Sequence, residues 1–103
     1  MGQPIAHIKS ETSGHGPCSP PSTLVESGGN NNVFISTGSA CILVVTTGGK
    51  AATHGCKDDP PHMDIVTGGS KRVLINKKGV ARQGDELNRG STITSGNKKV
   101  LVG

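Results

Sequence analysis

Short apolar runs rich in β-branched residues alternate with turns of Gly, Asn and Ser along the whole chain. Two examples are Ile42-Leu43-Val44-Val45 and Val73-Leu74-Ile75. The apolar residues do not recur at the spacing of a helix face, and 16 glycines and 6 prolines interrupt every window in which a helix could form. Because β-branched runs bounded by turn residues are typical of strands, the pattern predicts an all-β fold of short strands and tight turns.

One segment recurs three times. Residues 28–35, 68–75 and 95–102 align as a small residue, a polar turn and an apolar strand, with the sequences GGNNNVFI, GGSKRVLI and SGNKKVLV. Repetition of this kind marks a repeat architecture, and a strand, a turn and a second strand make a hairpin. The sequence therefore predicts a single domain, 1–103, built from three hairpin-like units at about 13–50, 53–85 and 86–103.

The chain has little apolar material for a core. Only 31% of its 103 residues are hydrophobic, and Phe34 is the only aromatic residue available to fill an interior. Such a short chain buries about two thirds of its unfolded surface, so a second source of stability is expected. Three cysteines cannot all pair within one chain, and no signal-peptide pattern opens the sequence. No segment approaches the roughly 20 apolar residues of a membrane span, so stable membrane insertion is not expected.

Two loops share a His-Gly step, a nearby cysteine and a Pro-Pro pair. They are residues 13–21, SGHGPCSPP, and residues 53–62, THGCKDDPPH. Imidazole and thiolate groups are preferred zinc ligands, so His15, His54 and His62 are candidate ligands of one zinc ion. Ser22 aligns with His62 in the first copy, which leaves one site in a repeated scaffold. A structural zinc ion contributes folding energy on the order of 10 kcal/mol.

The sequence leaves the fourth ligand open. Cys56 lies two residues after His54, and residues i and i+2 of an extended segment point to the same face, so Cys56 is the first candidate. Cys18 lies three residues after His15 and is the second, with water as the third. Cys41 sits in an apolar run and is expected to be a small buried residue.

A zinc ion with four protein ligands has no open position for substrate and is structural. The carboxylates near the candidate ligands are Asp58, Asp59 and Asp64 in a polar loop, and apolar residues to line a cleft are scarce. The sequence therefore predicts no enzymatic activity.

The formal net charge is +4, and pairs of basic residues recur at Lys71-Arg72, Lys77-Lys78 and Lys98-Lys99. Stacking aromatics and nucleic-acid-binding motifs are missing from the sequence. Paired lysines in solvated turns keep a small β protein soluble and discourage edge-to-edge association of strands. Nucleic acid is therefore not an expected partner.

Residues 73–85, VLINKKGVARQGD, resemble the motif of the PAAR-repeat proteins, in which a strand is followed by Asn-Gly-Lys-Pro-Ala-Ala-Arg and Gly-Asp. The Ser-Gly-His-Gly and Pro-Pro-His loops and the final Val-Leu-Val-Gly are also similar, so the resemblance covers nearly the whole chain. Gly79 and Val80 replace the Pro and Ala of the motif, and residues 39–42, SACI, replace it in the first repeat. Where the family often carries a cysteine, residues 88–90 read NRG.

The resemblance implies a small cone or prism with a structural zinc ion near its tip, held by three histidines and one cysteine. His15, His54 and His62 match the family histidines, and Cys56 or Cys18 supplies the thiolate. It also implies that the base of one monomer caps a trimeric β-helical spike in a contractile injection machine, either a phage tail or a type VI secretion system. The chain would then be made in the cytoplasm without a signal peptide, reach the tail tip or be secreted, and meet the target envelope transiently.

Two other function classes remain open from the sequence. One is a cytosolic zinc-binding module that recruits another macromolecule, and the other is a small zinc hydrolase. Metal binding alone does not separate the three, because each of them uses the same ligand residues.

Overall fold

The computed structural model describes the backbone of residues 2–14, 21–36, 40–56 and 59–103, and the side chains of these residues outside 54–60. Within the described residues the chain forms ten short strands and no helix, which confirms the prediction of an all-β fold. None of the described residues forms a helix that could cross a bilayer. The strands are β1 (Gln3–Ile5), β2 (Leu24–Glu26), β3 (Phe34–Ser36), β4 (Cys41–Leu43), β5 (Lys50–Ala51), β6 (His54–Cys56), β7 (Asp59–His62), β8 (Leu74–Ile75), β9 (Lys78–Gly79) and β10 (Asn97–Val102).

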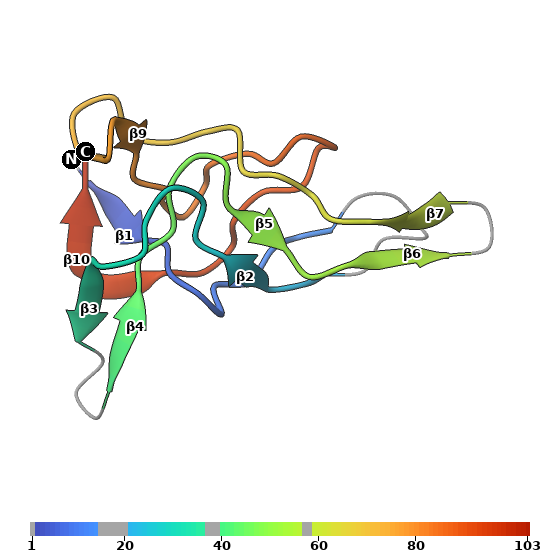
Figure 1. Cartoon of the computed structure of the whole chain (residues 1–103), viewed down its shortest axis with the longest axis horizontal. Helices are drawn as coiled ribbons and strands as arrows, with labels where there is room; N and C mark the ends of the chain where they lie inside the picture. Colours follow the sequence, from blue (N-terminus) through green and yellow to red (C-terminus); the bar gives the residue numbers. More distant parts are fainter. Residues whose placement is uncertain (1, 15–20, 37–39, 57–58) are drawn as a thin grey trace.

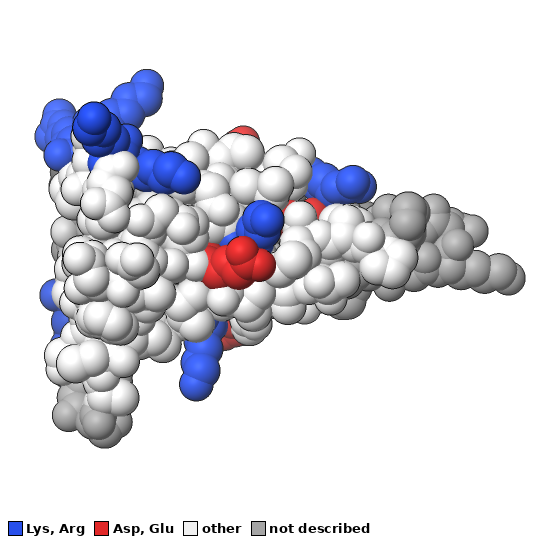
Figure 2. Space-filling model, in the orientation of Figure 1, with Lys and Arg blue, Asp and Glu red and all other residues white. Residues whose placement is uncertain are grey.

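The strands pair antiparallel, two by two, as β1 with β10, β2 with β5, β3 with β4, β6 with β7 and β8 with β9. The molecule measures 38 × 29 × 24 Å. Strands β6 and β7 lie at one end of the long axis, and β1, β10, β3, β4 and β9 lie toward the other (Figure 1). The outline narrows from this wide end, called the base below, toward β6 and β7 (Figure 2).

Three chain segments close a triangle of backbone hydrogen bonds at the centre. Ala6 donates to Ala81 (2.9 Å), Ala81 donates to Val45 (2.9 Å), and Val45 donates back to Ala6 (3.2 Å). A second cycle lies beside the first and runs in the opposite direction, with Ile8 donating to Leu43 (2.9 Å), Thr47 to Gly79 (2.8 Å) and Gln83 to Pro4 (2.8 Å). The side chains of Ala6, Val45 and Ala81 are fully buried. The segments 4–8, 43–47 and 79–83 are therefore equivalent parts of a threefold arrangement.

The same threefold pattern continues beyond the central triangle. Each central segment is followed by a residue with positive φ, which is 80° at Lys9 and 96° at both Gly48 and Gly84. The amides of these residues donate to the carbonyls of Leu24, Val66 and Ile93, respectively, at 2.7 to 2.9 Å. The side chains of those three acceptor residues are buried and, together with the central triad, form most of the first core cluster. Burial of aliphatic side chains from three equivalent segments provides the hydrophobic stabilisation of the fold.

At the base, the three segments aligned from the sequence use the same turn. The side chains of Asn30, Ser70 and Asn97 each accept a hydrogen bond from the amide two residues later, at distances of 2.9 to 3.2 Å. A side chain that bonds to its own backbone in this way stabilises a turn. A second core cluster lies behind these turns and includes Ile35, Val102 and the partly buried Ile75. The aligned positions are therefore structurally equivalent.

The third unit draws its residues from both ends of the sequence. Residues 86–103 contain no counterpart of the central segments 43–47 and 79–83, and residues 4–8 fill this position through the hydrogen bonds given above. The pairing of Gln3 with Val102 and of Pro4 with Leu101 in β1 and β10 joins the two parts. Each predicted unit thus needs a central segment, and the N-terminal residues supply the third.

The structure corrects two expectations about individual side chains. Cys41 was expected to be buried, but it is an exposed free cysteine. The reason is its position at the start of β4 opposite Ser36, at the outer end of the β3–β4 hairpin and away from the core. Phe34, the aromatic residue available for the interior, is 53% exposed because β3 turns its neighbour Ile35 toward the core instead.

Two leucine truncations test the layered core. Leu24→Ala removes a fully buried side chain and is expected to lower the free energy of unfolding by about 2–5 kcal/mol, measured by denaturant titration. Leu74→Ala makes the same chemical change at a position 55% exposed and is expected to cost less than about 1 kcal/mol. Equal losses in the two variants would contradict the assignment of core and surface.

Candidate metal centre

Two long loops leave the threefold scaffold on the side of the narrow end. They follow Thr12 and Ala51, whose amides donate to the carbonyls of Ser22 (2.8 Å) and Asp64 (2.9 Å) across the start and end of each loop. The third equivalent closure, from Leu87 to Ser91 (2.8 Å), encloses only the short turn 88–90. The predicted ligands therefore belong to the two long loops of one threefold set.

The structure describes the predicted ligands to different degrees. His15 and Cys18 lie outside the described residues. His54 and Cys56 belong to β6, where the backbone is described and the side chains are not. His62 ends β7 and is described in full. The prediction of a zinc site at these residues therefore stays a prediction.

The β6–β7 hairpin places two of the predicted ligand positions opposite each other. His54 pairs with His62, and Cys56 pairs with Asp59. The segment 54–56 is extended, as predicted, but the register shifts between His54 and Cys56. Because such an irregularity changes the alternation of faces along a strand, spacing alone does not decide whether Cys56 or Cys18 is the thiolate ligand.

His62 contacts a buried carboxylate. Its Nε2 atom lies 3.2 Å from Oδ1 of Asp64, and the exposed fractions of the two side chains are 12% and 1%. The Nε atom of Arg89 lies 3.9 Å from the same carboxylate oxygen. A buried carboxylate needs charged or polar partners of this kind, so Asp64 is held between an imidazole and a guanidinium.

This geometry fits the support that metal-binding histidines receive in proteins. A ligating histidine usually bonds a carboxylate through one ring nitrogen, which fixes the orientation of the ring and leaves the other nitrogen for the metal. In His62 the nitrogen that faces the carboxylate of Asp64 is Nε2. Among the fully described side chains, no three His, Cys, Asp or Glu residues gather closely enough to hold a metal.

Sequence reasoning placed Asp64 near the candidate ligands but missed its partner Arg89. Residues 88–90 form the third and shortest turn of the narrow end, and Asn88 exchanges hydrogen bonds with Ile65, at 2.9 Å through its amide and 3.1 Å through its Oδ1. This pairing brings Arg89 to the carboxylate. The contact of Arg89 with Asp64 could have been anticipated from the threefold repeat, because the repeat aligns the turn 88–90 with the two long loops.

The alignment of Ser22 with His62 is wrong. Ser22 is equivalent to Asp64, because the two residues accept the same backbone hydrogen bond in their units, from Thr12 and Ala51, respectively. The error arose because the two copies were aligned on their Pro-Pro pairs. The segments before and after these pairs differ in length between the first and second units. The buried carboxylate is therefore a feature of the second unit only, since the third unit has Ser91 at this position.

At the opposite end of the molecule, large apolar side chains are exposed at equivalent positions of all three units. Each base turn is followed by two apolar residues that point outward, with exposed fractions from 36% to 60%. They are Val33 and Phe34, Val73 and Leu74, and Val100 and Leu101. These six side chains define what we call the base face, and exposed apolar surface of this kind marks an interaction site.

Comparisons with protein-family models and with curated proteins give no match to this chain.

The contact between His62 and Asp64 gives a testable expectation for metal binding. Asp64→Asn keeps the size of the side chain but removes its charge, and it is expected to weaken zinc binding about 10- to 100-fold, measured by competition with a chromophoric chelator. Asp85→Asn is the control, because Asp85 pairs with Arg82 instead of a histidine. Equal zinc affinity in the Asp64→Asn variant and the unaltered protein would contradict a supporting role for Asp64.

Proposed function

We propose that this chain is the zinc-stabilised tip of a contractile injection machine, a small conical prism of three hairpin-like units that caps a trimeric β-helical spike. The observation that carries the proposal is the base face, where a pair of apolar residues is exposed at equivalent positions of each of three units. The resemblance of residues 73–85 to the PAAR motif supports the same function.

A threefold partner accounts for the repetition of the base face. A single chain that docks on the end of a trimer must offer the same contacts in three directions. The pairs in the first, second and third units meet this requirement even though their identities differ, since each unit contributes one Val and one larger apolar residue. A ligand without threefold symmetry would give no reason for an apolar pair in every unit.

The hairpins of the base also fit the chemistry of a spike end. A β-helix that stops leaves open backbone donors and acceptors and apolar side chains, which associate with other chains unless they are covered. Docking of the base face removes the apolar side chains of both partners from water, at about 25 cal/mol per Å² of apolar surface buried. The cap therefore protects the spike end as well as sharpening it.

Zinc would serve at the narrow end, where apolar side chains give way to polar loops. The proposed ligands are His15, His54 and His62, with Cys56 or Cys18 as the fourth. A zinc ion held by these residues would cross-link two loops that are distant in sequence and resist their unfolding under the force of contraction. In this role the metal is structural, and the proposal includes no enzymatic step.

Docking through the base face gives a testable prediction. A double substitution, Val73→Asp with Leu101→Asp, places carboxylates in the apolar contacts of two units and is expected to weaken binding about 100-fold or more. Binding is measured by calorimetry against a purified tip fragment of a trimeric β-helical spike protein. Val25→Asp is the control, since Val25 is 44% exposed, about as much as Val73 at 42%, but lies outside the base face.

Unchanged affinity of the double variant, or an equal loss in the control, would contradict docking through the base face. Failure of the unaltered chain to bind the trimeric fragment at all would contradict the proposed function itself.

The proposed zinc site gives a separate prediction about metal content and stability. The purified chain is expected to contain one zinc ion, measured by elemental analysis, and to lose thermal stability when a strong chelator removes it. Of the variants Cys18→Ser and Cys56→Ser, one is expected to lose zinc, and that variant identifies the thiolate ligand. A protein that is free of metal yet equally stable with and without chelator would contradict the zinc-stabilised tip.

A further inference from the structure

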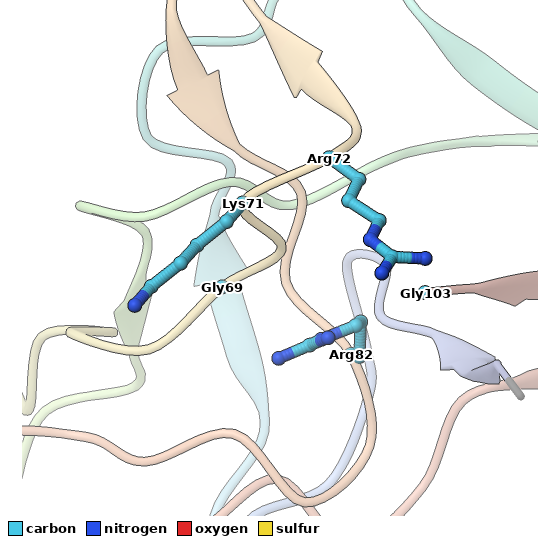
Figure 3. Close-up of a pocket in the computed structure, with 5 residues that line it drawn as sticks. All are labelled: Gly69, Lys71, Arg72, Arg82 and Gly103. Atoms are coloured by element: carbon cyan, nitrogen blue, oxygen red, sulfur yellow. The ribbon is translucent and has the colours of Figure 1, made fainter.

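A pocket of about 380 Å³ opens at the edge of the base, lined by Gly69, Lys71, Arg72, Arg82 and Gly103. Three of these five residues are cationic, and the other two are glycines that contribute backbone. Lys71 and Arg72 extend from the loop before β8, and Arg82 extends from the segment after β9 (Figure 3). The pocket therefore presents basic side chains from two segments and no apolar side chain.

The wall of the pocket is fixed by hydrogen bonds. The hydroxyl of Ser70 donates to the carbonyl of Gly103 (2.5 Å) and accepts from the amides of Arg72 (3.0 Å) and Val73 (2.9 Å). Ser70 is 3% exposed. One buried hydroxyl thus ties the loop that carries Lys71 and Arg72 to the strand that ends near Gly103.

Arg82 is held in a fixed orientation by Asp85. Its Nε and Nη2 atoms lie 3.0 and 2.9 Å from the two carboxylate oxygens. The hydrogen bond to Asp85 raises the pKa of Arg82 further above its ordinary value, against a smaller opposing effect of burial. Lys71 and Arg72 are exposed and form no ion pair with a described residue. No Asp or Glu side chain of the described residues therefore forms an ion pair with these two positive charges.

The charge of the surrounding surface has the same sign. The segments of the base, 28–43, 68–79 and 95–103, contain six Lys or Arg residues and no Asp or Glu. Basic side chains cluster at one corner of the wide end, and acidic side chains in this view lie nearer the middle of the molecule (Figure 2). Any surface that docks on the base face therefore meets a rim that is basic in the second and third units.

We propose that this pocket receives an acidic side chain of the spike protein, whose carboxylate is attracted by its cationic lining of Lys71, Arg72 and Arg82 when the base face docks. The inference rests on the proposed function and adds the chemistry of the partner. Val73 of the base face directly follows Arg72, and Leu101 lies two residues before Gly103, so a protein docked on the base face would lie beside the pocket. Guanidinium groups bind carboxylates through paired, charge-assisted hydrogen bonds.

The pocket also distinguishes one unit from the other two. The positions equivalent to Lys71 and Arg72 are Asn31 and Asn32 in the first unit and Lys98 and Lys99 in the third. At the position of Arg82, the other units have Thr46 and His7, which follow the central residues Val45 and Ala6. Only the second unit therefore combines three Lys or Arg side chains. One of the three spike subunits would receive this contact, which the other two units do not offer.

The equivalent basic pair of the third unit supplies a matched control. Lys71→Ala with Arg72→Ala removes two charges from the pocket, and Lys98→Ala with Lys99→Ala removes two charges from the same rim outside it. Affinity for the purified trimeric spike fragment is measured at low and moderate salt. The pocket variant is expected to lose at least tenfold in affinity and the control less than about threefold, because charge-assisted hydrogen bonds contribute more than rim charges.

The outcomes of this experiment distinguish failure of the pocket proposal from failure of the proposed function. Equal losses of affinity in the two variants would show that the rim acts only through its total charge. This result would contradict carboxylate binding in the pocket. No loss in either variant, with docking still abolished by Val73→Asp and Leu101→Asp, would overturn the pocket and leave the spike-tip function standing. An added test reverses the charges with Lys71→Glu and Arg72→Glu, and a loss no greater than that of the alanine variant would also contradict carboxylate binding.

Discussion

The closed triangle of backbone hydrogen bonds between residues 4–8, 43–47 and 79–83 is the constraint on which the rest of the structure depends. Each central segment exchanges backbone hydrogen bonds with both of its neighbours, so none of the three keeps an open edge at the centre. Ala6 and Ala81 allow the backbones to approach closely, and only Val45 adds bulk at the axis. Satisfying buried backbone groups in this way avoids a cost of about 1–3 kcal/mol for each donor or acceptor left unpaired. A chain with 31% hydrophobic residues can therefore hold a defined interior without a large core.

Closure of the triangle also links segments that are far apart along the chain. The N-terminal segment donates to residues near 81 and accepts from residues near 45, and β1 pairs with β10 at the other end of the sequence. Contacts over such distances carry a large entropic cost of loop closure and form slowly. The equivalent turns at Asn30, Ser70 and Asn97 are local by comparison, since each side chain bonds within its own turn. We expect these turns to form early and the central triangle to complete the fold.

The all-β class and the equivalence of the base turns could be predicted from the sequence because both depend on local chemistry, such as β-branched runs and side chains that bond their own backbone. The role of residues 4–8 could not, because it depends on pairing with two distant segments. Hydropathy also fails to separate a core from an interface, since Phe34 faces solvent while Ile35 beside it is buried. At the narrow end, sequence identified His62 and Asp64 as neighbours of one loop, but the register that makes Ser22 equivalent to Asp64 required the hydrogen bonds themselves. The loops at the narrow end differ in length between units, so aligning the units on their proline pairs gave the wrong equivalence for Ser22.

The threefold pattern is kept at some positions and broken at others, and the two groups of positions face different physical demands. The outward apolar pairs of the base are present in every unit, as contact with a threefold partner requires. The buried carboxylate appears once, at Asp64, where the other units have serine, and it contacts the one described candidate ligand. The proposed metal ligands also depart from the threefold pattern, because His15 belongs to the first long loop and His54 and His62 both belong to the second. The pocket of Lys71, Arg72 and Arg82 is likewise confined to one unit. Repetition in this chain thus follows the symmetry of the proposed partner, and departures from it coincide with the proposed single-site chemistry of a metal ion or a carboxylate.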